Sequence, residues 1–94
     1  MNFRDKIIPL ERLASWRAQL RARAQSLAVT NGCFDVLHAG HVTYLEAARN
    51  QGDALLVGVN GDEAVRALKG TGRPLNSEGD RASVLAALQA VDAV

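Results

Sequence analysis

Residues 30–41 read TNGCFDVLHAGH, and this stretch governs the interpretation of the whole chain. Its first residue, Thr30, ends a short apolar run at 27–30 that has the character of a buried strand. After it, apolar residues recur at helical spacing from Val42 to Arg49, and Gly52 is a suitable end for that helix. The stretch is therefore predicted to be the connection between a strand and a helix.

Both histidines of the chain lie in this connection, three residues apart. If the helix begins here, His38 and His41 share one of its faces, so their imidazoles can converge on one ligand. Gly40 removes a side chain between them and allows a ligand to approach the backbone. Free N–H groups at the start of a helix favour a phosphate. These features predict an anion site.

The remaining segments extend this unit into alternating strands and helices. Ala54–Val59 is nearly continuous apolar sequence, typical of a strand covered on both faces. We expect helices at 9–24, 61–68 and 79–90, a loop at 69–79, and the start of a third strand at 92–94. Alternation of this kind favours an α/β fold with parallel strands and right-handed crossovers. Ligands then bind beyond the carboxyl ends of the strands.

The last predicted helix has an inward face and a capped start. Its inward residues are expected to be Val84, Leu85, Leu88 and Val91. Ser77 or Asp80 is expected to cap its first turn.

Length and composition favour one small domain. The chain has 94 residues, of which 48% are hydrophobic and 22% charged, so it is expected to fold. No apolar run is long enough to cross a membrane, and the N-terminal residues carry charges where a signal peptide needs an apolar stretch. A single cysteine, Cys33, provides no internal disulfide. We expect a cytoplasmic protein without membrane partners.

Charge is unevenly distributed along the chain. Residues 1–25 carry a balance of +4, and residues 26–94 carry −3. The basic charges are spaced as on the solvated face of a helix and lack interleaved aromatic residues. Nucleic acid is therefore not an expected partner, because electrostatic binding to it needs a broader basic surface.

Several motifs together resemble a known family. The segments TNGCFD and HAGH resemble the signature of the HxGH nucleotidyltransferases, the cytidylyltransferase-like superfamily. The segments Gly58–Asp62 and Lys69–Pro74, with Arg81 after them, extend the resemblance. The set is most similar to the adenylyltransferase domains of bacterial ADP-heptose synthases, and it covers about residues 7–94.

The resemblance implies a Rossmann-like open parallel sheet of the nucleotidylyl transferase type, with five strands in the order 3-2-1-4-5. Residues 1–94 would then be the N-terminal portion of the domain, truncated after the start of the third strand. Within it, 1–25 forms a leading amphipathic helix and 26–94 a βαβαα core. The first strand would keep a free apolar edge, which invites self-association or completion of the sheet by further chain.

The resemblance also implies the reaction. AMP would pass from ATP to a sugar 1-phosphate, with D-glycero-β-D-manno-heptose 1-phosphate as the expected acceptor, and Mg²⁺ would accompany the triphosphate. The implied catalytic residues are His38, His41 and Lys69. The implied nucleotide or phosphate contacts are Asn31, Gly32, Cys33, Phe34, Asp35, Gly40, Asp62, Arg73 and Arg81. No resident metal site is expected.

Other interpretations stay open at this point. The protein could be a cytidylyltransferase for a polyol phosphate such as glycerol 3-phosphate, or a nucleotide-binding fragment without turnover. Cys33, His38 and His41 are zinc ligand types, although their spacing fits no closed four-ligand module. Cys33 could instead be a nucleophile or a small packing residue. Structural alternatives are helix capping for Asp35 and Asp62, a solvated loop charge for Lys69 and Arg73, and a surface charge for Arg81.

Overall fold

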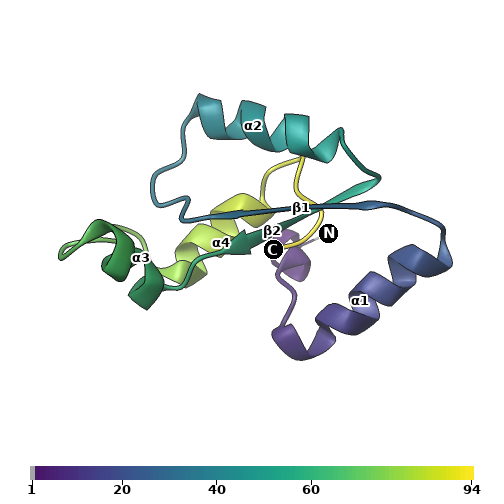
Figure 1. Ribbon diagram of the computed structural model, residues 1–94, viewed down its shortest axis with the longest axis horizontal. Coiled ribbons are helices and arrows are strands. Elements are labelled where there is room, and N and C mark those ends of the chain that lie inside the picture. Colours follow the sequence, from purple (N-terminus) through teal and green to yellow (C-terminus); the bar gives the residue numbers. More distant parts are fainter. Residues whose placement is uncertain (1) are drawn as a thin grey trace.

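Strands and helices alternate along the chain in the computed structural model, which describes residues 2–94 (Figure 1). The elements in order are a 3-10 helix η1 (Phe3–Lys6), α1 (Leu10–Ala22), β1 (Leu27–Gly32), α2 (Ala39–Arg49), β2 (Ala54–Val59), α3 (Asp62–Lys69) and α4 (Glu78–Ala86). The predicted α/β class is confirmed. β2 has the predicted bounds, whereas β1 extends to Gly32 and α2 begins at Ala39, earlier than the apolar spacing indicated.

The sheet is open and parallel. β1 and β2 pair in parallel along all 6 residues of each strand. On the other side of β2, Ala93 forms a parallel bridge with Leu56, and the N–H of Val57 donates to the Ala93 carbonyl at 2.9 Å. β2 therefore lies between β1 and residues 92–94, which agrees with a third strand beginning there.

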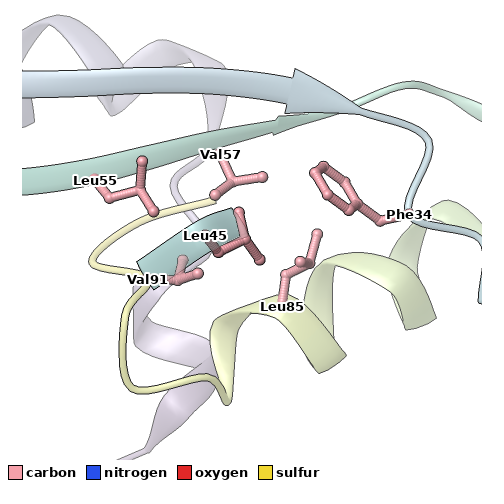
Figure 2. Close-up of a cluster of buried hydrophobic side chains, with 6 residues drawn as sticks. All are labelled: Phe34, Leu45, Leu55, Val57, Leu85 and Val91. Atoms are coloured by element: carbon pink, nitrogen blue, oxygen red, sulfur yellow. The ribbon is translucent and has the colours of Figure 1, made fainter. Parts of the chain in front are cut away.

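One hydrophobic cluster holds the helices against the sheet. It consists of Phe34, Leu45, Leu55, Val57, Leu85 and Val91. Figure 2 shows Leu55 and Val57 of β2 together with Leu85 of α4, and Phe34 beside them at one end. Because α2 and α4 both contribute to this cluster, they cover the same face of the sheet. The cluster also fixes Phe34, and so the start of the connection between β1 and α2.

The end of α4 differs from the prediction. α4 stops at Ala86, and the chain continues in turns toward Val91. The Nζ atom of Lys6 donates to the carbonyls of Leu88 and Val91, at 3.2 and 2.8 Å, so these acceptors are satisfied without further helix. The inward orientation predicted for Val84 is wrong, because this side chain is 52% exposed.

α1 stands apart from the other helices (Figure 1). Leu20 is its buried residue, and Leu10 at its start is 84% exposed. Leu13 of α1 lines a broad apolar hollow together with Val29 of β1 and Leu56 of β2. The face of the sheet opposite the main cluster is thus only partly covered within residues 2–94.

In this part of the chain, no helix combines the length and apolar character needed to span a membrane.

Candidate functional site

Three connecting segments meet at the carboxyl ends of the two strands. They are the β1–α2 connection (33–38), the start of α3 after β2, and the α3–α4 loop (70–77). Figure 1 shows α3 and both loops at this end of the sheet. The end of the sheet where parallel strands place ligands therefore carries most of the residues singled out from the sequence.

The two histidines form a closed arrangement at the start of α2. His38 is the N-cap residue, and its Nδ1 atom accepts a hydrogen bond from the N–H of Gly40 at 3.0 Å. His41 folds back so that its own Nδ1 accepts from the N–H of His38 at 3.2 Å. The ring centroids are 4.0 Å apart. The rings meet through this reciprocal cap, and not because both lie inside the helix as the spacing argument assumed.

The caps also determine where each imidazole carries its proton. Since both Nδ1 atoms accept hydrogen bonds, the neutral rings hold their protons on Nε2, which leaves two N–H donors for a ligand. Burial lowers the pKa of His41 below 6.5, and the charges of His38 and Lys69 lower it further. At pH 7, His41 is therefore a neutral hydrogen-bond donor.

Two glycines make room for aromatic rings. A Cβ atom at Gly40 would lie 2.8 Å from Cε1 of His38, and one at Gly32 would lie 3.0 Å from Cε2 of Phe34. The Phe34 ring is buried and meets His41 edge-on, with centroids 5.7 Å apart. A side chain at Gly40 would therefore collide with the His38 ring, and one at Gly32 would crowd the Phe34 ring. The Phe34 ring in turn packs against the His41 ring.

Asp35 fastens the α3–α4 loop to the β1–α2 connection. Its side chain is 1% exposed and accepts hydrogen bonds from the N–H groups of Leu75 and Asn76 and from Nε of Arg73, all between 2.8 and 2.9 Å. Burial raises the pKa of Asp35, but these three partners outweigh it and bring the pKa to about 2. The capping alternative for Asp35 is wrong, because His38 occupies the cap of α2.

Arg81 is the second buried charge of the site. It is 2% exposed, so the surface-charge alternative is wrong. Its Nη1 donates to the carbonyls of Cys33 and Asn60 at 2.7 and 2.8 Å, its Nη2 to Oδ1 of Asp62 at 2.7 Å, and its Nε to the carbonyl of Asn76 at 3.0 Å. Arg81 therefore ties together the ends of both strands, the start of α3 and the α3–α4 loop.

The other predicted residues lie around these two groups. Asn31 is exposed near the end of β1, and Lys69 is exposed as the last residue of α3. Asp62 is the first residue of α3, and because Gly61 holds the N-cap position, the capping alternative for Asp62 is wrong. The half-buried Cys33 accepts a hydrogen bond on Sγ from the side chain of Asn60 at 3.4 Å.

Within residues 2–94, no group of three or more His, Cys, Asp and Glu side chains is placed to hold a metal ion.

Sequence reasoning missed Asn60 and Asn76. The carbonyls of both accept from Arg81, and the Asn76 side chain donates to the Asp35 carbonyl at 2.7 Å. The only signal available was their position, since Asn60 directly follows β2 and Asn76 directly precedes the cap of α4. Their roles depend on which segments face each other, and local sequence does not carry that information.

Comparison with known proteins gives consistent results. Residues 29–94 match the family described as cytidylyltransferase-like. The bifunctional protein HldE of Methylobacillus flagellatus is 57% identical over 90 residues, which are 96% of this chain and 18% of that protein. The bifunctional protein HldE of Pseudomonas aeruginosa strain LESB58 is 57% identical over 86 residues, which are 92% of this chain and 18% of that protein. The chain thus spans less than a fifth of the length of these curated relatives.

A solved structure shares the fold. It is the lipopolysaccharide core biosynthesis protein of Thermoplasma volcanium, which is 32% identical, with a TM-score of 0.68. The similarity covers 73% of this chain and 55% of that chain. The predicted open parallel sheet therefore agrees with the architecture of a protein solved independently.

Proposed function

Because the chain belongs to the cytidylyltransferase-like family, we propose that it carries the phosphate-binding part of an enzyme that transfers AMP from ATP to a sugar 1-phosphate. The proposed acceptor is D-glycero-β-D-manno-heptose 1-phosphate, and the products are ADP-heptose and pyrophosphate. The observation that carries the proposal is the pair of imidazole rings, 4.0 Å apart at the start of α2. The name of the Thermoplasma protein, which refers to lipopolysaccharide core biosynthesis, supports the choice of acceptor.

The proposed step is a single displacement at phosphorus. A phosphate oxygen of the sugar 1-phosphate attacks the α-phosphorus of ATP and forms the new P–O bond. The bond from that phosphorus to the bridging oxygen breaks, and pyrophosphate leaves with the electron pair. Because the attacking oxygen is already anionic, the step needs no general base. Positioning and stabilisation of charge can supply most of the catalysis.

The residues of this chain supply the donors for that charge. The Nε2–H groups of His38 and His41 are proposed to donate to triphosphate oxygens at the positive end of the α2 dipole. Lys69, whose charge acts on His41, is proposed to bind a phosphate from the end of α3. Mg²⁺ would enter with the triphosphate, held mainly by phosphate oxygens and water, and supply further positive charge.

The nucleotide is proposed to lie along the segment that follows β1. Asn31 is exposed there, and the backbone of Gly32, Cys33 and Phe34 is proposed to border the nucleotide. Asp35 and Arg81 have their polar groups engaged by the protein, so their proposed contribution is to hold the surrounding loops.

We also propose that further strands pair with the free side of β1. Within residues 2–94, β1 pairs with β2 alone, and its Val29 side chain is 63% exposed. An apolar strand with an unpaired edge favours association, either with further chain of the same protein or with a second copy. The greater length of the Thermoplasma relative supports the first arrangement.

A substrate matrix tests the proposed reaction. Pyrophosphate release by the full-length protein would be measured with ATP or CTP, each combined with heptose 1-phosphate or glycerol 3-phosphate. We expect release with ATP and heptose 1-phosphate. Release with CTP and glycerol 3-phosphate alone would replace the proposal with a polyol-phosphate cytidylyltransferase. Nucleotide binding without release in any combination would indicate a binding module.

A further inference from the structure

A depression lined partly by charged side chains lies outside the histidine pair. It has a volume of about 430 Å³ and is open to solvent between α3 and the α3–α4 loop. Its lining residues are Asp62, Arg66, Gly72, Arg73, Pro74 and Ser77. None of these residues belongs to α2 or to the β1–α2 connection, so the depression is distinct from the site of the two imidazoles.

Two charged side chains that line the depression, Arg73 and Asp62, each form an ion pair with a buried side chain of opposite charge. Nε of Arg73 donates to Asp35 at 2.9 Å, and the two side chains are 38% and 1% exposed. Oδ1 of Asp62 accepts from Arg81 at 2.7 Å, and these side chains are 35% and 1% exposed. In each pair a buried partner fixes a half-exposed group that lines the depression. A ligand therefore meets groups that are already oriented, which lowers the entropic cost of binding.

The chemistry of the lining favours a ligand with both a phosphate and hydroxyl groups. Arg73 keeps its terminal guanidinium nitrogens free of the bond to Asp35, and the exposed Arg66 adds a second guanidinium. Guanidinium groups bind phosphate by paired hydrogen bonds. Oδ2 of Asp62 forms no hydrogen bond among residues 2–94 and can accept from a hydroxyl. The same carboxylate repels a triphosphate, which carries much more negative charge.

Lys69 connects the depression to the histidine pair. It follows Arg66 by one turn of α3, and its charge lowers the pKa of His41. Asp35, which holds Arg73, lies on the short connection that leads to His38. Lys69 and Asp35 thus link the lining of the depression to the segment that carries the two histidines.

We propose that this depression is the subsite for the acceptor substrate, a phosphorylated sugar or polyol, with Asp35 and Arg81 as the positioning residues behind it. Arg66 and Arg73 bind the acceptor phosphate, and Asp62 accepts from its hydroxyl groups. This inference rests on the proposed nucleotidyl transfer, because it assigns a separate binding site to the acceptor, the substrate other than ATP.

Kinetics of the full-length protein with each substrate varied in turn test the assignment. Arg66→Gln and Arg73→Gln are each expected to raise the KM for heptose 1-phosphate about tenfold, the value of one charged hydrogen bond, and to leave the KM for ATP within about twofold. Arg21→Gln on the exposed surface of α1 makes the same charge change outside both sites and serves as the matched control. A rise in the KM for ATP without a rise for the acceptor would overturn the proposal.

The positioning role of Asp35 is tested by comparing effects on KM and kcat. Asp35→Asn is expected to raise the KM for the acceptor more than it lowers kcat, because it releases Arg73 and leaves the histidines in place. An equal effect on the KM of both substrates would indicate general loosening of the loops and contradict a positioning role.

Direct binding separates this proposal from the proposed reaction. Binding of heptose 1-phosphate and of glycerol 3-phosphate, without nucleotide, would be measured by calorimetry for the wild type and Arg66→Gln. A loss of about tenfold in affinity for either ligand supports the subsite, and the ligand affected identifies the acceptor, whether or not turnover is observed. Equal affinity of the two proteins for both ligands would overturn the subsite, even if ATP turnover proceeds as proposed.

Discussion

Replacing Gly40 with alanine separates the geometry of the histidine pair from the stability of the fold. The new Cβ would lie 2.8 Å from Cε1 and 3.0 Å from Nδ1 of His38, inside ordinary van der Waals contact. The imidazole must then retreat by several tenths of an ångström. This movement weakens the hydrogen bond from the Gly40 N–H to Nδ1, which caps α2.

The two effects on stability oppose each other. Loss of an N-cap costs about 1 kcal/mol, whereas alanine in place of glycine in a helix contributes up to about 1 kcal/mol. We therefore expect the free energy of unfolding to change by no more than about 1 kcal/mol. The effect on turnover is expected to be about tenfold or more, because a full 1 Å misplacement at a catalytic group can cost about 10²-fold in rate and the shift here is several tenths of that.

The assay compares kcat for pyrophosphate release with the midpoint of thermal unfolding. Gly79→Ala is the matched control, because Gly79 is the second residue of α4 just as Gly40 is the second residue of α2. A Cβ atom at Gly79 would meet nothing within 4 Å. We expect this variant to keep full activity. If Gly40→Ala also kept it, the position of His38 would not matter for the reaction.

Three further variants test other parts of the account. Arg81→Leu leaves buried acceptors and a carboxylate unpaired, and we expect urea unfolding to show a loss of about 3–5 kcal/mol; a loss below about 1 kcal/mol would contradict the described network. Burial is the main cause of the lowered pKa of His41, and the charge of Lys69 adds to it. Lys69→Met removes that charge, so NMR titration should show the pKa of His41 rising toward 6.5. An unchanged pKa would place Lys69 away from the site. Folding lowers the pKa of Asp35 from 3.8 to about 2, so its charge stabilises the fold above pH 3.8, and this contribution is lost as the pH falls toward 2. Asp35→Asn should abolish that pH dependence in urea unfolding, and retention of it would mean that other carboxyls are responsible.

Local sequence was sufficient to predict most of the elements. β2 was predicted with its observed bounds because its apolar run is continuous and ends at Asn60-Gly61. The pairing of His38 with His41 was predicted from their spacing alone, although the structure achieves it by a reciprocal cap. Such features depend on residues close together in the chain, and their patterns are visible in the sequence.

Features that depend on distant segments were not predictable in this way. Asp35 has its partners about 40 residues later in the chain, and Arg81 reaches back to Cys33. Nothing in the local pattern distinguishes these buried charges from surface charges. The chain after α4 also depends on a distant residue, since Lys6 near the other end of the chain donates to the carbonyls of Leu88 and Val91. Resemblance to a family implied nucleotide or phosphate contacts for Asp35 and Arg81, and what the structure shows is that both bind the loops around the site.

The histidine pair is the central element of this account, and single-turnover transfer of AMP tests it most directly. The full-length wild type and His41→Ala would be mixed with saturating ATP and limiting heptose 1-phosphate, and formation of ADP-heptose would be followed with time. We expect His41→Ala to form product at least about 10²-fold more slowly, since it lacks a donor to the charge that develops at phosphorus. Product formation at a rate close to that of the wild type would contradict the role assigned to the two imidazoles.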